Sequence, residues 1–159
     1  MKILLSMLVF LVTVPTFAAT PTQKLAAAIA RAEGYYTRGT LPNRCKNPGD
    51  LKAPHGQRFP GQVGTSKSGY AIFRRDADGF AALEHQIDKV VLGSSSHYSV
   101  NMTLRDFSRR YALTTVWAKN VAHTLGVDTS TPMWAILDTA PSLQVQPDRR
   151  ALDFVLGEN

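Results

Sequence analysis

The 159-residue sequence predicts a mainly α-helical domain of about six helices, with a small β-hairpin lobe after the first helix. Apolar residues recur at helical spacing over most of the chain, between residues that typically start and stop helices. Residues 37–68 instead hold four prolines and five glycines, which exclude a long helix there. Cys45 is the only cysteine, so no intramolecular disulfide can form, and a hydrophobic core must stabilise the fold.

The first 19 residues have the layout of a secretory signal peptide. Lys2 precedes an apolar run over residues 3–14, and small residues follow up to Ala19. The run is shorter than the roughly 20 residues of a membrane span, although an uncleaved anchor is the alternative. We expect cleavage near Ala19 and one mature domain, residues 20–159, exported to the periplasm or secreted, without stable membrane insertion.

The expected mature chain has 17 Lys and Arg residues against 12 Asp and Glu residues, a net charge of +5. Such a surface can simply favour solubility, or it can attract an anionic polymer such as cell wall, envelope surface or nucleic acid. We expect no nucleic-acid partner, because the basic pairs are dispersed without a recognisable binding motif. These pairs are Arg74 and Arg75, Arg109 and Arg110, and Arg149 and Arg150.

The first helix is expected to begin near Pro21 and to end at Glu33. Leu25 and Ile29 follow helical spacing, and Gly34 stops the pattern. On a helical wheel Glu33 lies about 40° from Ile29, at the edge of the buried stripe.

The turn-rich segment after this helix is expected to form the β lobe. Short extended pieces are predicted at residues 50–52 and 70–73, the second rich in strand-forming residues. A structureless loop of this length would be unusual in a compact domain unless it were functional. Three of the later helices have capping residues at their starts, and Gly93 and Gly126 stop two of them. The later helices are expected over residues 76–92, 103–111, 115–125, 131–137 and 148–156.

Glu33 is the candidate acid. The two other glutamates are Glu84, expected at the solvent edge of a helix, and Glu158, at the chain end. A carboxylate at a helix C-terminus faces the negative end of the helix dipole, and partial burial adds a desolvation cost, so both raise its pKa. A protonated carboxylic acid near neutral pH is what protonation of a glycosidic oxygen requires. An ordinary exposed helix-end glutamate is the alternative.

Four segments carry a family resemblance: IARAEGYYTRGTLPNRCKNPGDL, GYAIFRRDADGFAALEHQI, TLRDFSRRYAL and VAHTLGVD. In order and spacing they resemble phage-related and bacterial lysozyme-like proteins of the lytic transglycosylase superfamily. In that group a helix-end Glu precedes an Asn-Asn-Pro-Gly-Asn-Leu motif. The resemblance covers about residues 29–128 and implies a lysozyme-like fold. It also implies that Glu33 is the general acid that cleaves the N-acetylmuramic acid to N-acetylglucosamine bond of peptidoglycan glycan strands.

Asp50 is where the chain departs most clearly from this pattern, because the group usually has Asn there. Asn47, Pro48, Gly49 and Leu51 match the loop motif. If Asp50 only closes the turn, Glu33 acts as acid and then base, as in lytic transglycosylases, and the substrate's own hydroxyl attacks. If Asp50 is a second carboxylate about 5 to 9.5 Å from the first, the reaction is hydrolysis. Turn chemistry favours the first role, so we expect a lytic transglycosylase.

Substrate contacts are expected from Tyr36, Asn47, Tyr70 and Tyr111, since sugar rings stack on aromatic faces and bind amides and hydroxyls. Each tyrosine could instead belong to the core. The Tyr111 hydroxyl could hold the Glu33 carboxyl, and Asn47 could orient an N-acetyl group or simply hold the turn.

Other chemistries have weaker support. The histidines are scattered without a metal-ligand pattern, and no nucleotide or phosphate motif is present, so we expect no metal and no cofactor. Cys45 is expected to be buried. The non-enzymatic alternative is a secreted module that binds cell wall or another protein through a lysozyme-like fold. The wider context could be wall remodelling, a secretion or conjugation machine, phage-type lysis or attack on competitors.

Overall fold

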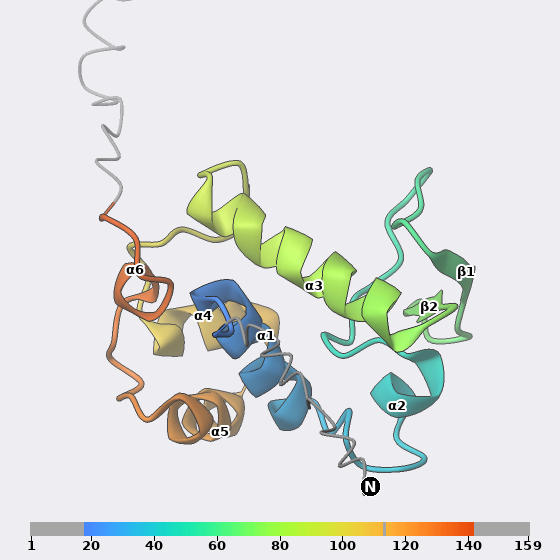
Figure 1. Ribbon diagram of the computed structural model, residues 1–159, viewed down its shortest axis with the longest axis horizontal. Coiled ribbons are helices and arrows are strands. Elements are labelled where there is room, and N and C mark those ends of the chain that lie inside the picture. The colour runs from blue at the N-terminus through green and yellow to red at the C-terminus, as the bar shows by residue number, and fades with distance from the viewer. Residues whose placement is uncertain (1–17, 113, 142–159) are drawn as a thin grey trace, which may run out of the picture.

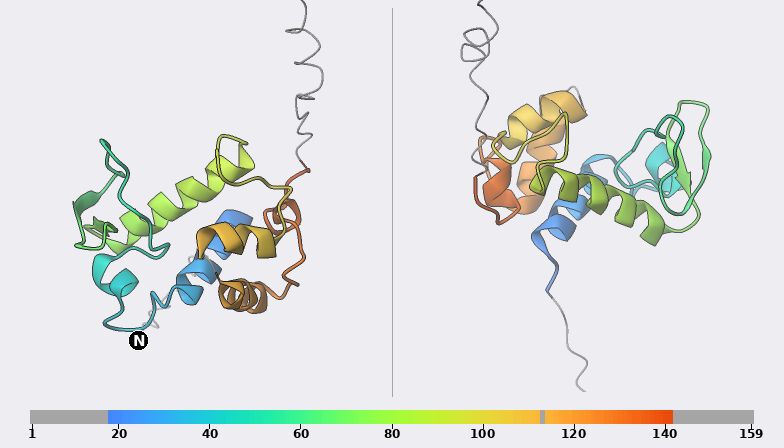
Figure 2. Two further views of the ribbon diagram at one scale, coloured as in Figure 1. Left: turned by 180° about the vertical axis from the view of Figure 1, so that it is seen from behind. Right: turned by 90° about the horizontal axis from the view of Figure 1, so that it is seen from above.

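The computed structural model describes residues 18–112 and 114–141, and these contain six helices and one two-stranded antiparallel sheet. Figures 1 and 2 show α2 and the sheet gathered at one end of the long helix α3, with α4, α5 and α6 toward its other end. The mainly α fold with a small β element is therefore as predicted. The elements are α1 (Pro21–Ala32), α2 (Leu41–Cys45), β1 (Gln62–Thr65), β2 (Ala71–Phe73), α3 (Asp76–Val91), α4 (Leu104–Tyr111), α5 (Thr115–Leu125) and α6 (Met133–Ile136).

Helix α1 forms where the sequence predicts it. Thr20 caps its start in a capping box with Gln23, and Pro21 occupies the first turn, where its missing N–H costs nothing. The helix buries Leu25 and Ile29 together with three alanines, and it packs against α5 and α3. This arrangement places the end of α1 in the middle of the molecule.

The lobe, defined here as residues 38–75, contains α2, β1, β2 and their connections. β1 and β2 pair antiparallel, and an isolated bridge between Lys52 and Tyr70 extends the pairing to the segment after Asp50. The extended piece expected at residues 70–73 is therefore present, whereas in the piece expected at residues 50–52 only Lys52 forms a bridge and Asp50 has a left-handed φ of 46°. The short helix α2 was not predicted, although Thr40 caps it and Pro42 lies in its first turn.

The rest of the structure, α1 and α3–α6, forms the helical body around one main hydrophobic cluster. Leu83 and Ile87 of α3 pack in it with Leu104 and Phe107 of α4 and Val121 of α5. The expected helices α3 to α6 are all present. The expected helix over residues 148–156 and the apolar run of the predicted signal peptide lie outside the described residues. Within the described part of the chain, no helix has the length and apolar character that a membrane span requires.

Gly79 lets the start of α3 contact the lobe directly. A Cβ atom built on Gly79 would lie 2.0 Å from the backbone oxygen of Lys46, so no larger residue fits there. α3 and the loop after α2 are thus in contact through their backbones. This contact fixes where the lobe begins relative to the helical body.

Candidate active site

A cavity of about 820 Å³ lies between the helical body and the lobe. One wall comes from the end of α1, from α4 and α5, and from the connections before α4 and α5. The other wall comes from the loop after α2 and from the residue before β2. The lining residues used below are Glu33, Tyr98, Tyr111 and Trp117 from the helical body, and Gly49, Asp50, Lys52 and Tyr70 from the lobe.

Gly34 determines where Glu33 lies. Gly34 has a φ of 74°, a left-handed conformation that glycine adopts at little cost. Its N–H donates to Arg31 O, and the N–H of Tyr35 donates to Ala30 O, which is the hydrogen-bond pattern of a Schellman helix end. Glu33 is therefore the last residue before the chain turns away, and its side chain lines the cavity.

Among the described residues, the Glu33 carboxylate has one side-chain hydrogen-bond donor, which is the indole of Trp117. The Nε1–H of Trp117 donates to Glu33 Oε1 over 2.7 Å. Burial raises the pKa of Glu33 above its ordinary value, the Trp117 bond opposes this by favouring the carboxylate, and the negative charge of Asp50 raises the pKa further. The net direction is upward, as the sequence predicted. A partly buried carboxyl with a raised pKa has the properties that a general acid needs.

Tyr111 does not hold Glu33, so that part of the sequence interpretation is wrong. The Tyr111 hydroxyl donates instead to the backbone oxygen of Gly49, across the cavity floor. Burial raises the pKa of Tyr111 well above its ordinary value, and the charge of Glu33 adds to this. The hydroxyl therefore stays protonated and remains a donor to the lobe.

Four aromatic rings stabilise the helical wall. Phe107 lies between Tyr98 and Tyr111, with ring centroids 4.4 Å and 5.7 Å away, and Tyr111 lies 4.8 Å from Trp117. Three of these rings also line the cavity, namely Tyr98, Tyr111 and Trp117. Trp117 is thus fixed by neighbouring rings on one side and by its bond to Glu33 on the other.

Asn47 stabilises the loop and does not face the cavity, so its expected contact with substrate is corrected. The side chain is fully buried. Its Nδ2 group donates to Leu51 O and Ala71 O over 2.9 and 3.0 Å, and its Oδ1 accepts from Leu51 N over 2.9 Å. Both amide donors and the acceptor are therefore used within the protein, which leaves the turn-holding role that the sequence also allowed.

Gly49 brings the loop close to the helical body. A Cβ atom on Gly49 would lie 2.7 Å from Leu83 Cδ1 and 3.1 Å from the Tyr111 hydroxyl. Only glycine allows this approach without displacement of a neighbour. The close approach also lets Tyr111 donate to the Gly49 carbonyl.

Asp50 faces the cavity with its side chain free of hydrogen bonds within the described residues. Its φ of 46° is left-handed, a conformation that Asp and Asn tolerate better than most residues. Its Oδ1 is buried without a hydrogen-bond partner among the described residues. Burial raises the pKa of Asp50, and the positive charge of Lys52 opposes this. The backbone of Asp50 belongs to the turn, whereas the turn's side-chain bonds come from Asn47.

Tyr70 and Tyr36, both expected to contact substrate, have different positions. Tyr70 lines the cavity, and the Lys52 ammonium lies 3.5 Å from its ring centroid, a cation–π contact. Tyr36 is 57% exposed, packs edge-on against Tyr35 and does not line the cavity. The structure therefore groups Tyr70 and Tyr111 with Glu33 and Asp50, and leaves Tyr36 apart.

Trp117, Tyr98 and Lys52 were not identified from the sequence as site residues. Trp117 fits the apolar stripe of its helix, and a buried indole N–H usually needs an acceptor, which is the one signal that could have indicated its role. Cys45 is buried, as expected, and burial raises the pKa of its thiol. Among the described residues no three His, Cys, Asp or Glu side chains gather as a metal site.

Comparison of this chain with protein-family models, with curated proteins and with solved structures found no match.

Proposed function

We propose that this protein cleaves the glycan strands of peptidoglycan between N-acetylmuramic acid and N-acetylglucosamine, with Glu33 as general acid. The observation that carries the proposal is the environment of Glu33. This partly buried carboxyl ends a helix, lines a cavity of about 820 Å³ and accepts one hydrogen bond from Trp117. The pKa of Glu33 is raised mainly by burial, which favours the protonated acid.

The chemistry starts with proton transfer from Glu33 to the glycosidic oxygen, and the bond between this oxygen and the sugar carbon then breaks. In lytic transfer a hydroxyl of the same muramic acid residue attacks that carbon, and its proton returns to Glu33. No water is consumed, and the product is an anhydro sugar. We propose this route because, of the two carboxylates that line the cavity, only Glu33 has a side-chain hydrogen bond to a described residue.

Hydrolysis is the second candidate, and the position of Asp50 favours it. A carboxylate that lines the same cavity and makes no side-chain hydrogen bond to a described residue is available to activate water. The two reactions differ by one water in the product. Mass spectrometry of the fragments released from purified sacculi therefore distinguishes an anhydro end from a reducing end.

The test of the proposed function is Glu33→Gln, which keeps the shape and the acceptor for Trp117 but cannot donate a proton as an acid. We expect release of soluble fragments from sacculi to fall about 10²- to 10⁴-fold, the usual contribution of a general acid. The matched control is Glu84→Gln on α3. The pKa of Glu84 is also raised by burial, but this glutamate does not line the cavity.

Retained activity in Glu33→Gln would contradict the role of Glu33. Binding of sacculi by a parent protein that releases no fragments would favour the alternative, a module that docks on cell wall without cleaving it.

A further inference from the structure

The positive charge of this protein is concentrated in the lobe. Residues 38–75 contain eight Lys and Arg residues and a single acidic residue, Asp50, so the lobe carries a net charge of +7. The whole chain carries +6, and everything outside the lobe therefore sums to −1. Asp50 lines the cavity, so the outer surface of the lobe holds cations without acidic neighbours from its own segment.

These cations are mostly available to a partner. Seven of the eight are exposed, and Lys46 is partly buried. Within the part of the chain that the structure describes, Arg75 is the one lobe cation in an ion pair, with Asp78 at 2.6 Å. Arg44, Lys46 and Lys52 donate to backbone carbonyls, which do not neutralise their charge.

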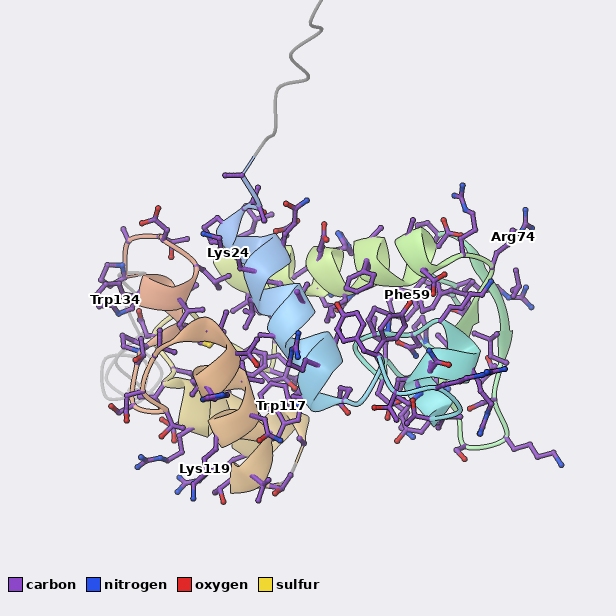
Figure 3. The ribbon with its side chains drawn as sticks, turned by 60° about the horizontal axis from the view of Figure 1, so that its bottom comes forward. Lys24, Phe59, Arg74, Trp117, Lys119 and Trp134 are labelled. Carbon is purple, nitrogen blue, oxygen red and sulfur yellow. The ribbon has the colours of Figure 1, made fainter. Side chains whose placement is uncertain are left out.

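One of the lobe cations, Lys52, lies at the cavity itself. Its ammonium lies there over the ring of Tyr70. Figure 3 shows Arg74 at the outer edge of the lobe, with its side chain directed away from the helical body. A long polymer with one segment in the cavity would therefore meet the basic surface with its next segment.

We propose that the lobe binds the carboxylates of the peptide stems of peptidoglycan. This inference rests on the proposed function, because it takes the polymer in the cavity to be a peptidoglycan strand. The sugar backbone of that polymer carries little charge, whereas its peptide stems carry free carboxylates at regular intervals. Exposed Lys and Arg side chains attract such groups over a distance and form charge-assisted hydrogen bonds with them on contact.

The test is a lobe variant that lacks three of the eight cations, Arg58→Gln, Lys67→Gln and Arg74→Gln, which lowers the lobe's net charge from +7 to +4. All three residues are exposed, and no side chain among them donates a hydrogen bond within the described residues, so the fold should be unaffected. The matched control removes three cations of the helical body, with Lys24→Gln, Arg109→Gln and Lys119→Gln. Lys24 and Lys119 are labelled on the helical body in Figure 3.

Binding is measured by fluorescence anisotropy with labelled, soluble glycan strands that carry peptide stems, whose carboxylates are either free or converted to methylamides. Every protein, including the reference, carries Glu33→Gln so that the strands stay intact. We expect the lobe variant to bind strands with free carboxylates about tenfold more weakly, because it loses three exposed ion pairs, and the control variant to change less than about twofold. High salt should reduce the difference in affinity between the lobe variant and the reference. Strands with blocked carboxylates should bind all three proteins alike.

Equal binding of strands with free carboxylates by the lobe variant and the reference would overturn the inference, and so would an equal loss on strands with blocked carboxylates. Tighter binding of a short DNA duplex that depends on the same three cations would also overturn it, by assigning the lobe to a phosphate polymer. These results are separate from the proposed function, which fails if the protein without Glu33→Gln releases no fragments or if Glu33→Gln retains activity.

Discussion

The two walls of the cavity each present one carboxylate, but they hold it differently. On the helical wall, Glu33 ends a helix that is built into the main core and accepts a bond from Trp117. On the lobe wall, Asp50 lies on a loop, and its side chain has no hydrogen bond within the described residues. A carboxyl held by a hydrogen bond, Glu33, thus shares the cavity with one that has no such bond, Asp50. We therefore expect different roles for the two groups.

The largest loss of stability in the lobe wall is expected on substitution of Asn47. Asn47→Ala removes three buried hydrogen bonds and leaves the carbonyls of Leu51 and Ala71 without this donor, so we expect a loss of about 3 kcal/mol in the free energy of unfolding. Urea unfolding followed by circular dichroism measures it. Asn43→Ala is the control, because Asn43 makes two side-chain bonds in a less buried place. An equal cost for both variants would contradict the central role of Asn47 in the lobe wall.

The helical wall should be weakened selectively by Trp117→Phe, which keeps a ring but removes the donor to Glu33. We expect about a tenfold loss of activity, because a hydrogen bond to a charged group contributes about 1.5 kcal/mol or more. The bond lowers the pKa of Glu33, so its loss should raise that pKa further. Activity requires protonated Glu33 and falls as pH rises through this pKa. The alkaline limb of the pH–rate profile should therefore move to higher pH.

A pH–rate profile measures this shift, and Trp134→Phe on α6 is the matched control because Trp134 does not line the cavity. An alkaline limb that stays in place in Trp117→Phe would show that the indole does not set the acidity of Glu33.

The smallest effect is expected for Asp50→Asn, which keeps a residue suited to left-handed backbone. If lytic transfer is correct, activity at the pH optimum should stay within about threefold, since no second carboxylate takes part. The charge of Asp50 raises the pKa of Glu33, so its removal should move the alkaline limb to lower pH, opposite to Trp117→Phe. Asp138→Asn is the control, because Asp138 also has a left-handed φ, of 52°, and is exposed. A loss of 100-fold or more would instead identify Asp50 as the second carboxylate of a hydrolase.

The sequence predicts what local chemistry determines. Helical spacing and Gly34 locate the end of α1 and hence Glu33, and capping residues locate the later helices. The inward position of Asn47 depends on the carbonyl of Ala71, which is 24 residues away. The partner of Glu33 is 84 residues away, at Trp117. Spacing within one helix cannot report such contacts, so the position of Glu33 at the helix end could be predicted and its hydrogen-bond donor could not.

The concentration of positive charge in the lobe differs from these contacts, because every residue that produces it can be read from the sequence. Of the three basic pairs, only Arg74 and Arg75 lie in the lobe, and the other six lobe cations stand singly in the sequence. They count as one group only once the structure shows that residues 38–75 form one lobe. The sequence contains the composition of the lobe, but the boundaries of the lobe come from the structure.

The contact between Gly79 and the oxygen of Lys46 has a mechanical consequence. Side chains at most interfaces can change rotamer and absorb small displacements, but two backbones already in contact cannot. The start of α3 therefore acts as a rigid stop for the loop that bears Asp50. The lobe therefore cannot move closer to the start of α3 at this point unless main-chain atoms are displaced. Main-chain atoms, rather than side chains, thus limit how closely the lobe approaches α3.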